Sequence, residues 1–473
     1  MLQRKTSLLF FAAVSLAIGL HPPVLSGQVP AQPADSPELS RQVTELKALV
    51  EKLQARVADL ENRVGPAPPV NAAAARPAEA IPAVTAPAPP TPEPHSGSDL
   101  LHGATFNLLL DGYYGYNFNA PIGRANLLRA YDVTSNGFSL NQAAVVTESA
   151  PDTGNGKRWG VRLDLQFGQA TETLQGNPAN EPRPDIYRNI FQAYGTYVVP
   201  VGNGITVDFG KWASSIGLEG NYTKDQINYS RSFWFTFLPF YHMGVRANAK
   251  VNDWLSVNYW VTNGTNQTEP FNGFKDELWG VVLQPRKTID WTINYYMGQE
   301  HPDSMYYPNG APAGLGNLPA QQGVPFAPIP NPPTGHLNII DTYLTWQVSP
   351  SFQMAFEGDD EIERLYRTSP PSHTIGGAVY ARYQVAPKLA FGVRSEYLSD
   401  RGGLFSGVTQ ALKENTVTLE YKLVDNFVAR LEWRRDASNQ PYFLTTTLGI
   451  LKKEQNTATV GLVWWFGSKQ GIW

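Results

Sequence analysis

Apolar and polar residues alternate one by one along most of the chain from about residue 104 onward. In RWGVRLDLQFG (158–168) the odd-numbered residues from Trp159 to Phe167 are all apolar, and the even-numbered residues are charged, amide or glycine. Because successive side chains of a β-strand point to opposite faces, this segment is predicted to be a strand with one apolar and one charged face. The same pattern recurs in 291–298, 388–398, 415–423 and 427–436.

The connections between the predicted strands alternate in length. Short turns, such as 201–204 and 424–426, are separated by long loops, such as 213–241 and 299–338. Short turns at one end and long loops at the other are typical of outer-membrane barrels. We therefore predict an all-β fold, a closed antiparallel transmembrane β-barrel of about 16 strands over residues 104–467. An even number of strands places both ends of the barrel on the short-turn, periplasmic side.

A secreted protein with two packed β-sheets is the main alternative, because its strands would alternate in the same way. It does not explain the regular difference between short and long connections. If lipid surrounds the apolar faces, the sheet has to close, because an open edge would leave unpaired backbone groups in hydrocarbon. We therefore expect residues such as Leu163 to contact outer-membrane lipid, and charged residues such as Arg162 to face a watery lumen.

The residues before the barrel predict three further segments. Basic residues, a short apolar run and then small residues predict a signal peptide over 1–27, although an uncleaved anchor would look similar. Val and Leu at heptad spacing predict a periplasmic α-helical coiled coil over 39–64 that forms a homo-oligomer, a dimer or a trimer. A single helix lying on another surface is the alternative for that segment. Pro and Ala dominate 65–103, which predicts a semi-rigid linker, and 468–473 form a C-terminal tail.

Composition and motifs narrow the possible functions. The net charge is −4, which shows no basic footprint for nucleic acid, and the absence of cysteine excludes disulfides and thiolate zinc sites. No hydrolase, zinc-protease or nucleotide-binding motif is present, so the sequence predicts no enzyme, cofactor or metal site. The acidic run EGDDEIER (357–364) could hold a hard cation through Asp359, Asp360 and Glu361, but we interpret it as a solvated loop tip.

Several stretches resemble the β-barrel porins of the OmpL-like type. They include DGYYGYNFN (111–119), VDFGKWASSIGLE (207–219), RSEYLSD (394–400) and, most specifically, NYSRSFWFTFLPFYHMGVRA (228–247). The resemblance implies a channel in the outer membrane of a Gram-negative-type bacterium, without cofactor or catalytic residues. SKQGIW extends the last predicted strand beyond the pattern of the family, which leaves open which aromatic residue serves as the assembly signal.

Two sets of candidate site residues follow. The alternation sends these charged residues into the lumen as a predicted pore lining: Arg158, Arg162, Asp164, Arg246, Arg382, Arg394, Glu396, Glu420, Lys422, Arg430, Glu432 and Arg434. Their signs nearly balance, as in a solvated lattice of ion pairs that either tunes ion selectivity or only lines the wall. The second set lies in the long loop 213–241 and consists of Lys224, Arg231, Phe233, Trp234 and Phe235.

That loop is too rich in aromatic residues for a tip exposed to water. We predict that it folds into the barrel as a constriction loop, while an aromatic belt at the membrane interface is the alternative. The sequence thus favours a porin for passive diffusion of small hydrophilic solutes. The alternative is a structural anchor in the outer membrane whose coiled coil binds the cell wall or a periplasmic partner.

Overall fold

A computed structural model of the chain describes residues 103–175, 181, 183–306, 326–469 and 471–473. The predicted signal peptide and coiled coil, and almost all of the predicted linker, lie outside the described residues. The described residues belong to a compact unit that spans 92–473. Their helices are all too short or too polar to cross a membrane.

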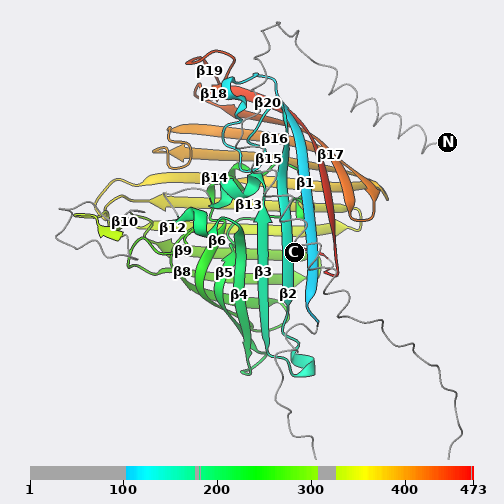
Figure 1. Ribbon diagram of the computed structural model, residues 1–473, viewed down its shortest axis with the longest axis vertical. Helices are drawn as coiled ribbons and strands as arrows, with labels where there is room; N and C mark the ends of the chain where they lie inside the picture. The colour runs from blue at the N-terminus through cyan, green and yellow to red at the C-terminus, as the bar shows by residue number, and fades with distance from the viewer. Residues whose placement is uncertain (1–102, 176–180, 182, 307–325, 470) are drawn as a thin grey trace, which may run out of the picture. The chain divides into compact units, whose positions relative to one another are not determined.

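Sixteen antiparallel strands form a closed barrel (Figure 1). Each barrel strand pairs with the barrel strands before and after it, and the last strand pairs with the first over Asn107–Asn117, which closes the sheet. The strands are β1 (Thr105–Asn117), β2 (Gly137–Ser149), β3 (Trp159–Phe167), β4 (Ile190–Val199), β5 (Ile205–Ala213), β6 (Tyr241–Lys250), β7 (Leu255–Thr262), β8 (Asp276–Arg286), β9 (Ile289–Gly298), β12 (Leu337–Ser349), β13 (Phe352–Glu363), β14 (Ser372–Ala386), β15 (Leu389–Arg401), β16 (Gln410–Val424), β17 (Phe427–Ser438) and β20 (Glu454–Gly467). The predicted closed barrel is confirmed, and the two-sheet alternative is wrong.

The remaining elements lie in the connections. Two small hairpins occur in long connections, β10 (Ser304–Tyr306) with β11 (Phe326–Pro328), and β18 (Phe443–Leu444) with β19 (Leu451–Lys452). Short helices occupy others: η2 (Ile122–Arg124), η3 (Thr153–Asn155), α3 (Gln169–Gln175), α4 (Pro184–Tyr187), η4 (Thr223–Asp225) and α5 (Phe233–Phe237).

The two faces of the strands divide as the alternation predicts. On β3, the outward Leu163 has an exposed fraction of 40%, whereas the neighbouring Arg162 is buried inside the barrel. The inward Asp164 and Gln166 are buried as well. The barrel therefore has an apolar exterior and a polar interior, which is the reverse of a water-soluble β-protein.

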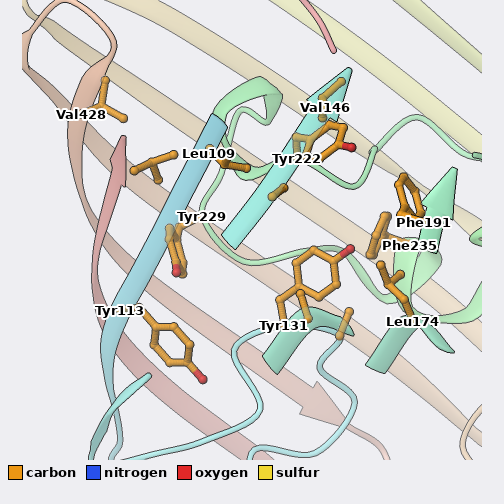
Figure 2. Packing of buried hydrophobic residues seen from close by; sticks show 14 residues of the cluster. Leu109, Tyr113, Tyr131, Val146, Leu174, Phe191, Tyr222, Tyr229, Phe235 and Val428 are labelled. Atoms are coloured by element: carbon orange, nitrogen blue, oxygen red, sulfur yellow. The ribbon is translucent and has the colours of Figure 1, made fainter. Parts of the chain in front are cut away.

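The hydrophobic core lies inside the barrel. Inward side chains of β1 and β2, such as Leu109 and Val146, belong to one cluster with Tyr222, Tyr229 and Phe235 from the connection between β5 and β6 (Figure 2). The interior is thus packed by a segment of the chain rather than left as an open tube.

The acidic run 357–364 is not a loop tip, which corrects our interpretation. It lies almost entirely in β13, which pairs with β14 as far as Glu363. The side chains of Asp359 and Glu361 are buried in the interior, whereas Asp360 lies on the other face and forms an ion pair with His373. The outward positions of this stretch include Gly358 and Asp360, so the apolar alternation that marks the other strands is missing here.

Replacing outward Leu163 with Arg should lower the free energy of unfolding by about 2–4 kcal/mol, the cost of a cation near the middle of the lipid-facing surface. Urea unfolding in lipid vesicles, followed by tryptophan fluorescence, measures this loss. Leu163→Phe is the control, because it changes size but stays apolar. Equal stabilities for the two variants would show that this face does not contact lipid.

Candidate functional site: the barrel interior and its inner loop

The connection between β5 and β6, residues 214–240, folds into the barrel, and we call it the inner loop. Glycines on the wall make room for it. A Cβ atom on Gly461 of β20 would lie 2.3 Å from the Tyr229 ring, and one on Gly392 of β15 would lie 2.7 Å from the Ile227 carbonyl oxygen. Side chains at these two positions would therefore push the inner loop away from the wall.

The first part of the inner loop is held by β12 and β13. The backbone N–H of Gly217 donates to Asp341 Oδ1 at 3.0 Å, and that of Leu218 donates to Glu357 Oε1 at 2.7 Å. Gly217 has a φ of 89°, in the left-handed region that glycine adopts without strain. These contacts fix the backbone of the loop against one side of the interior.

The middle of the inner loop contacts the opposite side of the interior. The Tyr222 hydroxyl donates to Asp164 at 2.6 Å, and the Tyr229 hydroxyl donates to Asp111 at 2.8 Å. The Thr223 hydroxyl donates to the same Asp111 carboxylate at 2.7 Å. The rings of Tyr222 and Tyr229 belong to one cluster with the inward side chains of Val146 on β2 and Leu109 on β1 (Figure 2).

Strands β15 and β17 bind the backbone of the second part. Glu432 accepts hydrogen bonds from the N–H groups of Tyr229 and Ser230 at 2.6 and 2.9 Å. Glu396 accepts from Phe233 and Trp234 at 2.9 Å each. The latter two donors are in the first turn of α5, where the helix itself provides no acceptor. The inner loop is therefore attached to several sides of the barrel and crosses its interior.

Arg231 stabilises the inner loop through hydrogen bonds to its backbone. Its guanidinium donates to the carbonyl oxygens of Gly220, Asn221 and Tyr229 at 2.8–3.1 Å and lies 4.8 Å from the ring centre of Tyr131. The side chain is fully buried. The guanidinium of Arg231 therefore binds the backbone of the loop itself, and whether its charge affects permeation stays a prediction. Phe233 and Trp234 are likewise fully buried, as parts of the loop's packing.

The predicted pore-lining charges all belong to inward positions, and most of them are paired. Under the inner loop, Arg394 contacts Glu414 at 3.0 Å and Glu219 at 2.7 Å, and Arg434 contacts Asp436 at 2.7 Å. These groups are buried, so here the ion pairs are shielded by protein atoms and are less exposed to solvent than the expected lattice. Other pairs are Arg162 with Asp164, Arg246 with Asp208, Arg382 and Arg430 with Glu420, and Lys422 with Asp425. Arg158 donates to the Val198 carbonyl oxygen at 3.4 Å. Whether any of them tunes permeation stays a prediction.

Two cavities flank the inner loop. One, of about 550 Å³, lies toward the short turns and is lined by Leu218, Lys224, Arg382, Glu420 and Arg430 among others. The other, of about 600 Å³, lies toward the long loops and is lined by Thr236, Phe237, Glu300, Glu361 and Glu363 among others. We call them the short-turn cavity and the long-loop cavity.

The two cavities differ in charge. Basic and acidic groups nearly balance in the short-turn cavity, whereas carboxylates outnumber basic groups in the long-loop cavity. Burial and the neighbouring Asp276 raise the pKa of Glu300 well above its usual range, which reduces its contribution to the negative charge. The basic residue of this cavity, Arg129, is already paired with Asp132 and Asp436.

The C-terminal residues turn into the short-turn cavity. Gly471 and Ile472 line it, and the Trp473 ring lies 5.8 Å from that of Tyr222. Lys224 donates to the Gly471 carbonyl oxygen at 2.8 Å and lies 4.5 Å from the centre of the Trp473 ring. Burial lowers the pKa of Lys224, and Asp225 opposes this shift. The constriction-loop residue Lys224 thus contacts the tail.

Sequence reasoning missed two groups that hold the interior together. Glu414 continues the alternation of 415–423 by one residue, so a longer reading of that strand identifies it. Glu219 lies in the inner loop, where no periodic pattern marks an inward side chain. Its pairing with Arg394 depends on the path of the loop.

Solved structures of outer-membrane proteins resemble the barrel. An anion-selective porin from Comamonas acidovorans shares 9% sequence identity with a TM-score of 0.49, over 77% of this chain and 99% of that one. The outer membrane channel DcaP of Acinetobacter baumannii shares 10% identity with a TM-score of 0.48, over 77% and 97% of the two chains. OprB of Pseudomonas putida shares 12% identity with a TM-score of 0.46, over 78% and 96%. At these identities the likeness concerns the fold alone.

A search among curated proteins finds no match. The model of the family described as "Putative beta-barrel porin-2, OmpL-like" matches residues 103–466, which include nearly the whole barrel. This match agrees with the closed barrel, its apolar exterior and its charged interior. The chain therefore belongs to this family of outer-membrane β-barrel porins.

Proposed function

We propose that this porin lets small hydrophilic solutes and ions diffuse passively across the outer membrane, and that the inner loop forms its constriction. The observation that carries the proposal is the inner loop itself, which crosses the interior between two charged cavities. Short turns of outer-membrane barrels face the periplasm, so the short-turn cavity is the periplasmic vestibule and the long-loop cavity the external one.

The dimensions of the cavities favour small solutes. Volumes of about 550 and 600 Å³ lie within the range of roughly 300–1,000 Å³ that holds a small molecule in other proteins. Residues of the inner loop line both cavities, so a solute that passes from one to the other has to pass the loop.

Conductance recordings in planar bilayers distinguish a channel from a structural anchor. Detergent-folded protein should produce discrete open-channel steps, because both cavities are polar and charged. Persistent silence from protein that is folded and inserted would instead favour a structural anchor whose coiled coil binds the cell wall or a periplasmic partner.

Ion selectivity should respond to Arg382, whose side chain lines the short-turn cavity and keeps an exposed fraction of 32%. Arg382→Gln should raise the potassium-to-chloride permeability ratio, measured as a shift in reversal potential under a salt gradient. The barrel should remain folded, because Glu420 keeps its ion pair with Arg430 at 2.8 Å.

Arg435→Gln is the matched control for Arg382→Gln. Arg435 also forms one ion pair, with Glu454, but about half of its side chain is exposed, and it lies on the outward side of β17 next to the inward Arg434. A reversal potential that is the same in both variants and in the parent would show that the short-turn cavity is not on the ion path.

Removal of residues 471–473 should raise single-channel conductance, because Gly471 and Ile472 occupy part of the short-turn cavity. The deletion leaves β20 and the contact of Lys469 with Asn107 in place. Trp473→Phe retains a ring against Tyr222 and should change conductance little. An unchanged conductance after the deletion would mean that the tail lies off the solute path.

A further inference from the structure

Three carboxylates meet where the inner loop touches the wall. They are Asp341 on β12 and Glu357 and Asp359 on β13, and all three are buried. One oxygen atom from each lies within 4.8 Å of the other two. We call them the acidic cluster.

The acidic cluster lies at the level between the two cavities. Along the inward face of β13, Ala355 lines the short-turn cavity and Glu361 lines the long-loop cavity. Glu357 and Asp359 fall between these positions. The cluster is therefore placed where the inner loop separates the vestibules.

The part of the chain that the structure describes provides no basic partner for the acidic cluster. Among the described residues, no Lys, Arg or His forms an ion pair with any of its three carboxylates, unlike the pairs formed by Glu414, Glu420 and Asp436. Asp341 and Asp359 are also direct partners in the β12–β13 register. Like charges in that position repel each other unless a cation or a proton lies between them.

Asp359 provides a second observation that points to a ligand. Its side chain is buried, with an exposed fraction of 3%, and no described residue outside the cluster donates a hydrogen bond to either of its oxygens. A buried carboxylate without a partner is costly. The oxygens of the other two are engaged: Asp341 accepts from Gly217 and Asn294, and Glu357 accepts from Leu218 and Tyr380. These donors orient two carboxylates toward the unpartnered third.

We propose that the acidic cluster binds a divalent hard cation, with a preference for Ca²⁺ over Mg²⁺. Carboxylate oxygens are the ligands of both ions. One oxygen atom from each of the three carboxylates lies within 4.8 Å of the other two, which is close enough for a single ion to bind all three. Ca²⁺ takes six to eight oxygen ligands in flexible geometry, whereas Mg²⁺ usually keeps several waters and binds only one or two protein carboxylates, so three carboxylates favour Ca²⁺.

The bound ion would connect the inner loop to the wall. Two of the three carboxylates that hold the ion, Asp341 and Glu357, also accept the N–H groups of Gly217 and Leu218. Orientation of first-layer ligands by such contacts is a common feature of metal sites. Ca²⁺ binding should therefore stabilise the position of this part of the loop, independently of what the barrel conducts.

Isothermal titration of the full chain tests the site. The protein is folded in detergent from denatured material, so that no lipopolysaccharide is present, freed of metal with EGTA and titrated with Ca²⁺ and then with Mg²⁺. We expect one saturable Ca²⁺ site and weaker binding of Mg²⁺. Absence of saturable Ca²⁺ binding would overturn the proposal and would favour a proton shared between Asp341 and Asp359.

Two neighbouring variants give the sharpest comparison. Asp359→Asn should abolish the saturable site, whereas Asp360→Asn should keep it, because Asp360 lies on the other face and contacts His373. Equal Ca²⁺ binding by both variants would contradict the proposal. If Asp359→Asn does not fold, thermal unfolding of the parent decides: Ca²⁺ should raise its Tm above that in EGTA, and an unchanged Tm would count against the site.

Discussion

Hydrocarbon offers no hydrogen-bond partner to a polypeptide, and the rest of this structure follows from that constraint. It requires the sheet to close, which the pairing of β1 with β20 achieves. Closure separates the two faces of every strand: the outward face has to be apolar, and every polar inward side chain is confined to one enclosed space. Where the inner loop fills the interior, a dense set of buried charges and amides therefore has to find its partners within the protein.

The inner loop meets most of that requirement. Carboxylates of the wall accept its backbone N–H groups, as Glu432 and Glu396 do, and Arg430 donates to the carbonyl oxygen of Thr223 at 2.8 Å. The same hydrogen bonds that provide partners for the polar groups of the barrel wall also hold the loop across the interior. Paired arginines and buried aromatic residues thus stabilise the position of the loop. The exposed charged groups of the two cavities are the ones that can contact solutes.

Much of the fold could be predicted from the sequence, because lipid on one side and polar groups on the other impose a period of two. The pattern weakens toward the end of β13, where Gly358 and Asp360 occupy outward positions and remove the apolar half of the signal. The aromatic content of 213–241 predicted an inward fold. The aromatic content could not show that the Arg231 guanidinium donates hydrogen bonds to carbonyl groups of the loop, because those contacts depend on the tertiary structure. The position of Trp473 against Tyr222 left no periodic signal either.

If solutes pass the inner loop, a group attached to the loop should obstruct them, and the absence of cysteine from the chain permits a direct measurement. Leu218→Cys places a single thiol on the loop at the wall of the short-turn cavity. A bulky, charged thiol reagent should then reduce the single-channel current, while Asp253→Cys, on an exposed short turn, should be modified without effect. Full modification of Cys at position 218, confirmed by mass, with no change in current would contradict the account.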